Sequence, residues 1–138
     1  MKHFKLRTWV IILVIIDMLS KYLFYNIHYL NHSSRIVPVL NTGISRSLPV
    51  PFLLILLISC VGIWLFIWLF TRKKLNRWIA AILIAGTLGN LIDRFIYGGV
   101  RDFINIQLFN FPIFNFADIM LTIWVMIRIV LVMLEKKE

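Results

Sequence analysis

Long apolar runs, separated by short polar stretches, make up most of this 138-residue chain. Four of them have the length of about 20 residues that a helix needs to cross the roughly 30 Å hydrocarbon core of a bilayer. They cover about residues 9–27, 52–70, 78–97 and 113–134. The pattern predicts four transmembrane helices in a single integral membrane domain, residues 1–138.

The composition supports this prediction. Hydrophobic residues make up 61% of the chain and charged residues 15%, and the mean hydropathy is +0.89. A soluble domain would carry about 25% charged residues. The net charge of +9 would also suit a protein that binds nucleic acid. However, the basic residues are bunched in short loops between apolar runs, which is typical of membrane topology. We therefore expect membrane lipid, and no nucleic acid, as a partner.

The distribution of basic residues orients the predicted helices. Nine lie near the two ends of the chain and in the turn at 71–77, and three lie in the other two connections: Lys2, Lys5, Arg7, Arg72, Lys73, Lys74, Arg77, Lys136 and Lys137, against Arg35, Arg46 and Arg101. Cytoplasmic loops carry the excess of Lys and Arg. We therefore expect cytoplasmic termini and outer loops at about 28–51 and 98–112. The first run resembles a secretory signal but has no small-residue cleavage site after it, so we expect it to be retained.

The outer loops contain two short strand patterns, at residues 36–40 and 104–108, and the second alternates clearly. Pro38 confines the first strand to an edge. In the third span, Ala81, Ala85 and Gly89 recur at four-residue spacing, which predicts close approach of another helix. The predicted fold is an all-α polytopic membrane protein with four transmembrane helices and a small extracytoplasmic β element.

The four aspartates all lie inside or against apolar sequence, where an ionised carboxylate is unfavourable and usually functional. The third span runs outward and the fourth runs inward. Asp93, Asp102 and Asp118 are therefore expected at the same face of the membrane. Arg94 follows Asp93 directly, and Asn90 lies within one helical turn of both. This spacing predicts a polar clamp between Asp93 and Arg94.

Asp17 precedes Lys21 by four residues, the favourable order for an ion pair along a helix. The pair either belongs to a site or locks the first span to its neighbours. We favour the second interpretation because a paired carboxylate stays ionised and is a poor proton donor. Of the four aspartates, Asp102 and Asp118 are then the ones whose negative charge is least compensated by residues nearby in the sequence. Two carboxylates held close share one proton near neutral pH, as the acid–base chemistry of an aspartic protease requires.

Other chemistries fit the sequence less well. There is no HExxH zinc motif and no GxSxG motif. Ser20 and Lys21 are adjacent, and adjacent helical residues do not face each other. His28 and His32 have the spacing of metal ligands, but neither outer loop offers a Cys or Glu to complete the site. We therefore expect no metal and no cofactor. Composition alone does not exclude the alternative that the aspartates form a proton or ion path through a small transporter.

Five short motifs occur in a set order along nearly the whole chain. Together they resemble bacterial lipoprotein signal peptidase (signal peptidase II). The chain departs from the usual pattern at Arg46-Ser47, where an aromatic and then a small residue are common. The matching stretches are Asp17-Met-Leu-Ser-Lys21, Asn41-Thr-Gly43, Gly89-Asn-Leu-Ile-Asp-Arg94, Val100-Arg-Asp-Phe103 and Phe114-Asn-Phe-Ala-Asp118.

The resemblance implies an enzyme of the bacterial cytoplasmic (inner) membrane, with its active site near the outer leaflet. It would cut the signal peptide from a lipid-modified prolipoprotein just before a diacylglyceryl-modified cysteine. By motif match, Asp102 and Asp118 are the expected catalytic pair. The alternative function is a small transporter or a catalytically silent lipid-binding or lipopeptide-binding relative. The expected supporting and substrate-binding residues are Asn41, Gly43, Asn90, Asp93, Arg94, Asn115, Asp17 and Lys21.

Overall fold

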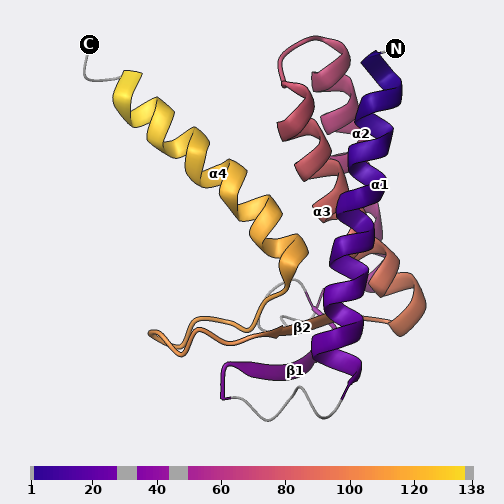
Figure 1. Ribbon diagram of the computed structural model, residues 1–138, viewed down its shortest axis with the longest axis vertical. Helices are drawn as coiled ribbons and strands as arrows, with labels where there is room; N and C mark the ends of the chain where they lie inside the picture. The colour runs from indigo at the N-terminus through magenta and orange to yellow at the C-terminus, as the bar shows by residue number, and fades with distance from the viewer. Residues whose placement is uncertain (1, 28–33, 44–49, 136–138) are drawn as a thin grey trace.

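The computed structural model describes residues 2–27, 34–43 and 50–135 (Figure 1). The helices are α1 (Lys2–Lys21), which continues into a short π-helical turn η1 (Tyr22–Asn26), α2 (Phe52–Thr71), α3 (Arg77–Tyr97) and α4 (Phe116–Glu135). The strands are β1 (Ile36–Asn41) and β2 (Val100–Ile104).

Within these described ranges, four helical segments are long and apolar enough to cross a membrane: Leu6–Asn26, Phe52–Thr71, Arg77–Tyr97 and Phe116–Leu134. The predicted number and order of the spans are therefore confirmed. Of the residues of α2, which the structure describes in full, Ile55 alone is buried; a half-buried face packs on α3, and the other apolar side chains of the helix are exposed. A surface of this kind is stable only where lipid covers it.

The helix α3 packs against α1, α2 and α4 and is the centre of the bundle. Ala81 and Ala85 are almost fully buried, as is Gly89, so the predicted small-residue face is confirmed. At Gly86 there is no room for a side chain, because a Cβ would come within 2.9 Å of the Ala117 carbonyl oxygen. The helices α3 and α4 therefore cross closely here. From this crossing, α4 diverges from the other three helices toward the C-terminus (Figure 1).

The strands β1 and β2 form an antiparallel pair beside the end of the bundle (Figure 1). Val39 lies opposite Asp102, and Asn41 lies opposite Val100. The register is irregular between Ile36 and Val39, at Pro38, which lacks a backbone N–H to donate. The sheet thus carries Asn41 and Asp102 to the end of the bundle.

The second strand was predicted at residues 104–108, and this prediction is wrong, because β2 covers Val100–Ile104. The helix α3 ends at Gly98, which has a left-handed φ of 71° that glycine adopts readily. A Cβ on Gly99 would come within 2.9 Å of the Asn41 carbonyl oxygen, so β1 is reached immediately after the turn. The strand therefore begins at once, and Asp102 lies within it rather than on a loop.

The helix α4 begins at Phe116, three residues later than the predicted start of the span. Phe114 is still paired with Ile104, donating its N–H to the Ile104 carbonyl at 3.1 Å and accepting the Ile104 N–H at 2.8 Å. The chain is therefore extended up to Asn115. The predictions on His28, His32 and Arg46-Ser47 concern residues outside the described ranges.

Candidate active site

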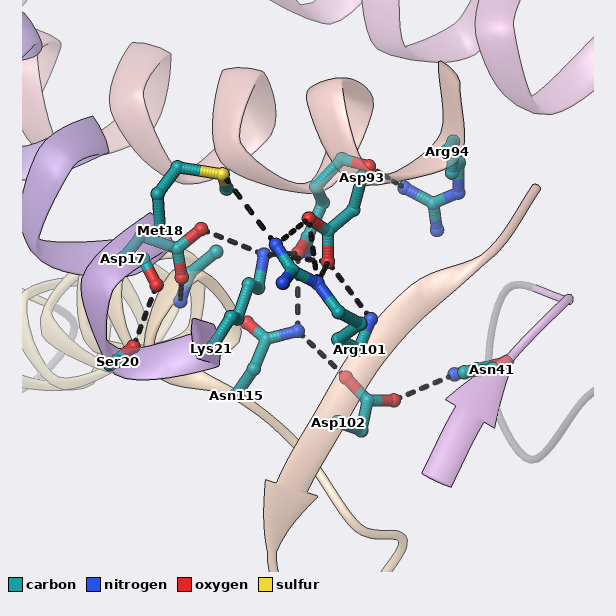
Figure 2. A network of polar contacts seen from close by, with 12 residues as sticks. Asp17, Met18, Ser20, Lys21, Asn41, Asp93, Arg94, Arg101, Asp102 and Asn115 are labelled. Carbon is teal, nitrogen blue, oxygen red and sulfur yellow. Dashed lines mark hydrogen bonds and ion pairs between the residues drawn. The ribbon is translucent and has the colours of Figure 1, made fainter. Parts of the chain in front are cut away.

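A connected network of polar side chains lies where α1, α3 and α4 meet the sheet (Figure 2). It contains every site residue predicted from the sequence. They come from five elements, α1, β1, α3, β2 and α4, and from the turns beside them, so the fold assembles the site from distant parts of the chain. The residues are Asp17, Lys21, Asn41, Gly43, Asn90, Asp93, Arg94, Asp102, Asn115 and Asp118.

The pair Asp17–Lys21 is fully buried and confirms the predicted ion pair. Lys21 Nζ donates to Asp17 Oδ2 at 2.7 Å and to Asn90 Oδ1 at 3.1 Å, and lies 3.5 Å from Asp93 Oδ2. The second oxygen of Asp17 accepts the backbone N–H of Ala117 at 2.9 Å. One α1 carboxylate therefore binds both a lysine of its own helix and the first turn of α4.

Asp93 forms ion pairs with Arg101 and Lys21, and the predicted pair with Arg94 is wrong. Arg101 Nη2 donates to Asp93 Oδ1 at 2.8 Å, and the Arg101 backbone N–H donates to Asp93 Oδ2 at 2.9 Å. Consecutive residues of a helix do not face each other. Arg94 instead donates to the Asn90 carbonyl oxygen at 3.4 Å. In Figure 2 its guanidinium lies apart from the Asp93 carboxylate.

Arg101 is a residue of the site that was not predicted from the sequence. Its Nη1 donates to Asn26 Oδ1 of η1 at 2.7 Å, and its guanidinium lies 4.2 Å from the centre of the Tyr97 ring. The available signal was the alternation of side chains along a strand, which puts Arg101 and Asp102 on opposite faces. Arg101 therefore binds the aspartate of α3 while Asp102 faces the other way (Figure 2).

Asp102 is 2% exposed, and two asparagine side chains donate to its carboxylate. Asn115 Nδ2 donates to Oδ1 at 2.7 Å, and Asn41 Nδ2 donates to Oδ2 at 3.1 Å. The Asn41 amide is oriented by Gly43, whose backbone N–H donates to Asn41 Oδ1 at 3.1 Å. The backbone of this turn thus fixes the Asn41 amide that donates to Asp102.

Asp118 lies in the first turn of α4 and forms a reciprocal cap with Asn115. The Asp118 N–H donates to Asn115 Oδ1 at 3.0 Å, and the Asn115 N–H donates to Asp118 Oδ2 at 3.2 Å. This is the geometry of a capping box, with Asn and Asp in place of the common residues. The other oxygen, Oδ1, accepts from Asn90 Nδ2 at 2.8 Å. The helix N-terminus also favours a negative charge here.

Asn115 connects the two carboxylates. It caps Asp118 with its backbone N–H and side-chain oxygen, and it donates through Nδ2 to Asp102. Burial, and secondly the charge of Asp118, raise the pKa of Asp102 to about 7. Desolvation and a nearby like charge both disfavour the ionised form of a carboxyl group. Asp102 therefore holds a proton at a higher pH than an ordinary aspartate does.

Both carboxylates border a cavity of about 650 Å³. Asn41, Asn90, Arg94 and Thr122 are the other polar residues of its lining. The remaining lining is apolar and includes one stripe of α4: Ile119, Ile123, Met126 and Ile127. Two aspartates, of which Asp102 has a raised pKa, thus border an apolar space large enough for part of a ligand.

In the described part of the chain, no group of three or more His, Cys, Asp or Glu side chains is arranged to hold a metal ion. His28 and His32, which have the spacing of metal ligands, lie in a segment that the structure does not describe.

Fold and site together define a multi-span helical membrane protein with a buried cluster of carboxylates at one end of its bundle. A family model described as Signal peptidase (SPase) II matches residues 9–134. The lipoprotein signal peptidase of Thermodesulfovibrio yellowstonii is 30% identical over 139 residues, which cover 92% of this chain and 93% of that protein. The one of Wigglesworthia glossinidia brevipalpis is 33% identical, over 87% of this chain and 88% of that protein. The chain belongs to the signal peptidase II family.

Two solved structures share the fold. Both are described as a bacterial membrane enzyme, and each is 26% identical to this chain. The first has a TM-score of 0.77 and covers 96% of this chain and 89% of its own. The second has a TM-score of 0.73, with 93% and 92% covered. The four helices and the small sheet are therefore an arrangement also found in membrane enzymes.

Proposed function

We propose that this protein removes the signal peptide from diacylglyceryl-modified prolipoproteins by cutting just before the lipidated cysteine, with Asp102 and Asp118 as the catalytic pair. The observation that carries the proposal is Asn115, which binds both carboxylates beside one cavity. A residue that holds two carboxylates in a fixed relation supports their acting together on one substrate.

The charges of the buried cluster support one shared proton. Among the described residues of the network, four aspartates lie with three basic side chains, Lys21, Arg94 and Arg101. If all of these groups were ionised, the cluster would carry one excess negative charge in a poorly solvated region. One proton on the pair Asp102–Asp118 makes it neutral, and buried charge is tolerated mainly when it is compensated.

The reaction then follows the chemistry of paired carboxyl groups. The ionised carboxylate takes a proton from a water molecule as the water oxygen attacks the scissile carbonyl carbon, and the protonated carboxyl hydrogen-bonds to the carbonyl oxygen. When the C–N bond breaks, the leaving nitrogen takes a proton from the pair. The products are a free carboxylate on the signal peptide and a free amino group on the lipidated cysteine.

The cavity supports a substrate with a large apolar part. Its polar groups gather around Asp102 and Asp118, while the stripe of α4 from Ile119 to Ile127 is apolar except for Thr122. An apolar wall beside a few convergent polar groups is typical of a site that buries most of its ligand. Lipid and signal peptide are both apolar, and the polar end accommodates the scissile peptide.

We infer that both termini and the turn at 71–77 lie in the cytoplasm of a bacterium, and that Asp102 and Asp118 lie near the outer leaflet of its cytoplasmic membrane. The distribution of basic residues supports this orientation. A topology reporter fused after Lys74 should report the cytoplasm, and one inserted near Asn31 should report the outside. The opposite pattern would overturn the orientation but leave the chemistry untouched.

The test of the function uses the purified protein in lipid vesicles with a prolipoprotein in two forms, one diacylglyceryl-modified and one unmodified. We expect cleavage of the modified form alone, with a new N-terminus at the lipidated cysteine. Equal cleavage of both forms would contradict the proposed specificity. Binding of the modified form without cleavage would favour a silent lipopeptide-binding relative instead.

A further inference from the structure

The loop between β2 and α4, residues 105–113, presents an unusually apolar surface. Both its ends are fixed, because Ile104 and Phe114 pair with each other. Between them Phe109 is 100% exposed, Leu108 57% and Phe111 52%. Contiguous exposed apolar groups of this size mark an interaction surface in most proteins.

The loop surface carries no charge. Asn105 Oδ1 accepts the Gln107 backbone N–H at 3.0 Å, and Gln107 Nε2 donates to the Ser34 carbonyl oxygen at 3.1 Å. The Asn105 backbone N–H donates to the Arg35 carbonyl at 2.9 Å. No charged residue occurs between Asp102 and Asp118 in the sequence. The loop therefore presents its apolar side chains together with the exposed neutral amides of Gln107 and Asn110.

The backbone of the loop makes the exposure of Phe109 more notable. Gln107, Phe109 and Asn110 have positive φ angles of 56°, 46° and 54°. A bulky residue such as phenylalanine rarely adopts this left-handed conformation. A strained backbone persists where its surroundings or its function require it. Here it directs an aromatic ring away from the protein, which indicates that something outside the chain receives the ring.

The position of the loop indicates what surrounds the Phe109 ring. In Figure 1 the orange segment after β2 reaches sideways from the bundle, on the side of α4, near the level where α1 and α3 end. These ends are the ends of predicted membrane spans. A segment that projects sideways at this level meets the boundary between lipid headgroups and acyl chains. Aromatic residues are enriched at that boundary.

We propose that Leu108, Phe109 and Phe111 insert into the lipid bilayer as an interfacial anchor, with phospholipid acyl chains as the partner. The surface continues the lipid-facing surface of the spans, so one medium covers both. Phe111, Pro112 and Ile113 also line the cavity that contains Asp102 and Asp118. The anchor thereby holds one wall of the cavity at the membrane boundary. The proposal does not depend on the catalytic chemistry.

The experiment exploits Cys60, which is the only cysteine of the chain and is exposed on α2. In a Cys60→Ser background, Phe109→Cys is labelled with an environment-sensitive fluorophore and the protein is placed in vesicles. Nitroxide-bearing phospholipids then report contact with lipid. Leu57→Cys, 58% exposed on α2, is the control for lipid contact, and Lys74→Cys in the turn between α2 and α3 is the control for water.

We expect the label at position 109 to resemble the label at position 57, with blue-shifted emission and strong quenching by the nitroxide lipids. Because the Phe109 side chain is fully exposed, its replacement should not impair folding. Emission and quenching like those at position 74 would overturn the proposal. A blue shift without nitroxide quenching would also overturn it, since a second protein copy rather than lipid would then cover the ring. The measurement needs no substrate, so it is independent of whether the protein cleaves one.

Discussion

The Asp17 carboxylate accepts the backbone N–H of Ala117 at 2.9 Å, which ties the C-terminal part of α1 to the first turn of α4. This N–H is one of those that a helix start leaves without a partner. Gly89 makes the contact possible, because a Cβ there would overlap the Asp17 carboxylate. Asp17 therefore helps to set the position of Asp118, the next residue along α4.

The first prediction concerns the ion pair of α1. Asp17→Ala should lower the free energy of unfolding by about 3–5 kcal/mol, because it leaves the buried Lys21 without its nearest carboxylate. Lys21→Met alone should also destabilise. The double variant should be less destabilised than the sum of the two, since neither charge is then left without its partner. Thermal unfolding in detergent measures this. Strict additivity would show that the two residues do not depend on each other.

The second prediction separates the two arginines near Asp93. Arg101→Ala should lower the free energy of unfolding by about 3–5 kcal/mol, because it breaks a buried ion pair. Arg94→Ala is the matched control: it leaves the Asp93 ion pairs intact and should reduce turnover with a much smaller loss of stability. Unfolding temperature and turnover are measured on the same preparations. A larger stability loss for Arg94→Ala than for Arg101→Ala would contradict the assignment.

The third prediction concerns Asn115. Asn115→Ala should lower the stability by about 0.5–2 kcal/mol, as loss of a helix cap does. It should also reduce turnover strongly, since the Asp102 carboxylate loses the Asn115 Nδ2 donor and the Asp118 N–H loses the oxygen that caps it.

Asn76 provides the control, because its side chain caps α3 at the other end of the bundle by accepting the Ile79 N–H at 2.9 Å. Asn76→Ala should destabilise by a similar amount while turnover per folded molecule stays unchanged. If both variants lost turnover in proportion to their stability alone, Asn115 would have no role beyond capping.

The fourth prediction concerns pH. The pKa of Asp102 is raised from 3.8 to about 7, first by burial and secondly by the charge of Asp118. The folded state therefore holds this proton more tightly than the unfolded state. Its contribution to stability is present at low pH and is lost as the pH rises through about 7. Activity should fall above about pH 7 as well, because the pair then loses its shared proton.

Asp102→Asn removes this titration. The stability of the variant relative to the natural protein should increase as the pH rises from about 4 to about 7 and then level off. Thermal unfolding across this range, in the same detergent, is the measurement. A difference that does not change with pH would show that Asp102 titrates alike in the folded and unfolded states.

The sequence predicted those parts of the structure that depend on local spacing. The four spans follow from the length of the apolar runs, and the pair Asp17–Lys21 follows from the helical repeat. The start of α4 is also local, since Asn115 and Asp118 have the three-residue spacing of a capping box. This spacing marks the start of the helix at Phe116, whereas the length of the apolar run alone predicts a start three residues earlier.

Interactions between distant elements were not predictable in the same way. The partner of Asp93 is decided by where β2 lies, and Arg101 reaches it only after the turn at Gly98. The alternation at residues 104–108 is typical of a strand, but pairing with β1 selects the segment before it. Neither choice is encoded by residues near in sequence, so each required the folded arrangement.

The central claim is that Asp102 and Asp118 act together in catalysis. Asp→Asn keeps the shape of each side chain but removes its ability to accept and release a proton. Both single variants should retain membrane insertion and binding of the lipidated substrate. These two properties should be measured before turnover. Any loss of turnover then reflects a slower chemical step.

The most direct measurement is the turnover of a diacylglyceryl-modified prolipoprotein by Asp102→Asn, Asp118→Asn and the double variant. Each single change should lower turnover by at least roughly a hundredfold, the lower end for loss of acid–base catalysis. The double variant should be little worse than either single one, because residues that act as a unit are not additive. Near-normal turnover by either single variant, or a strictly multiplicative loss in the double variant, would contradict the claim.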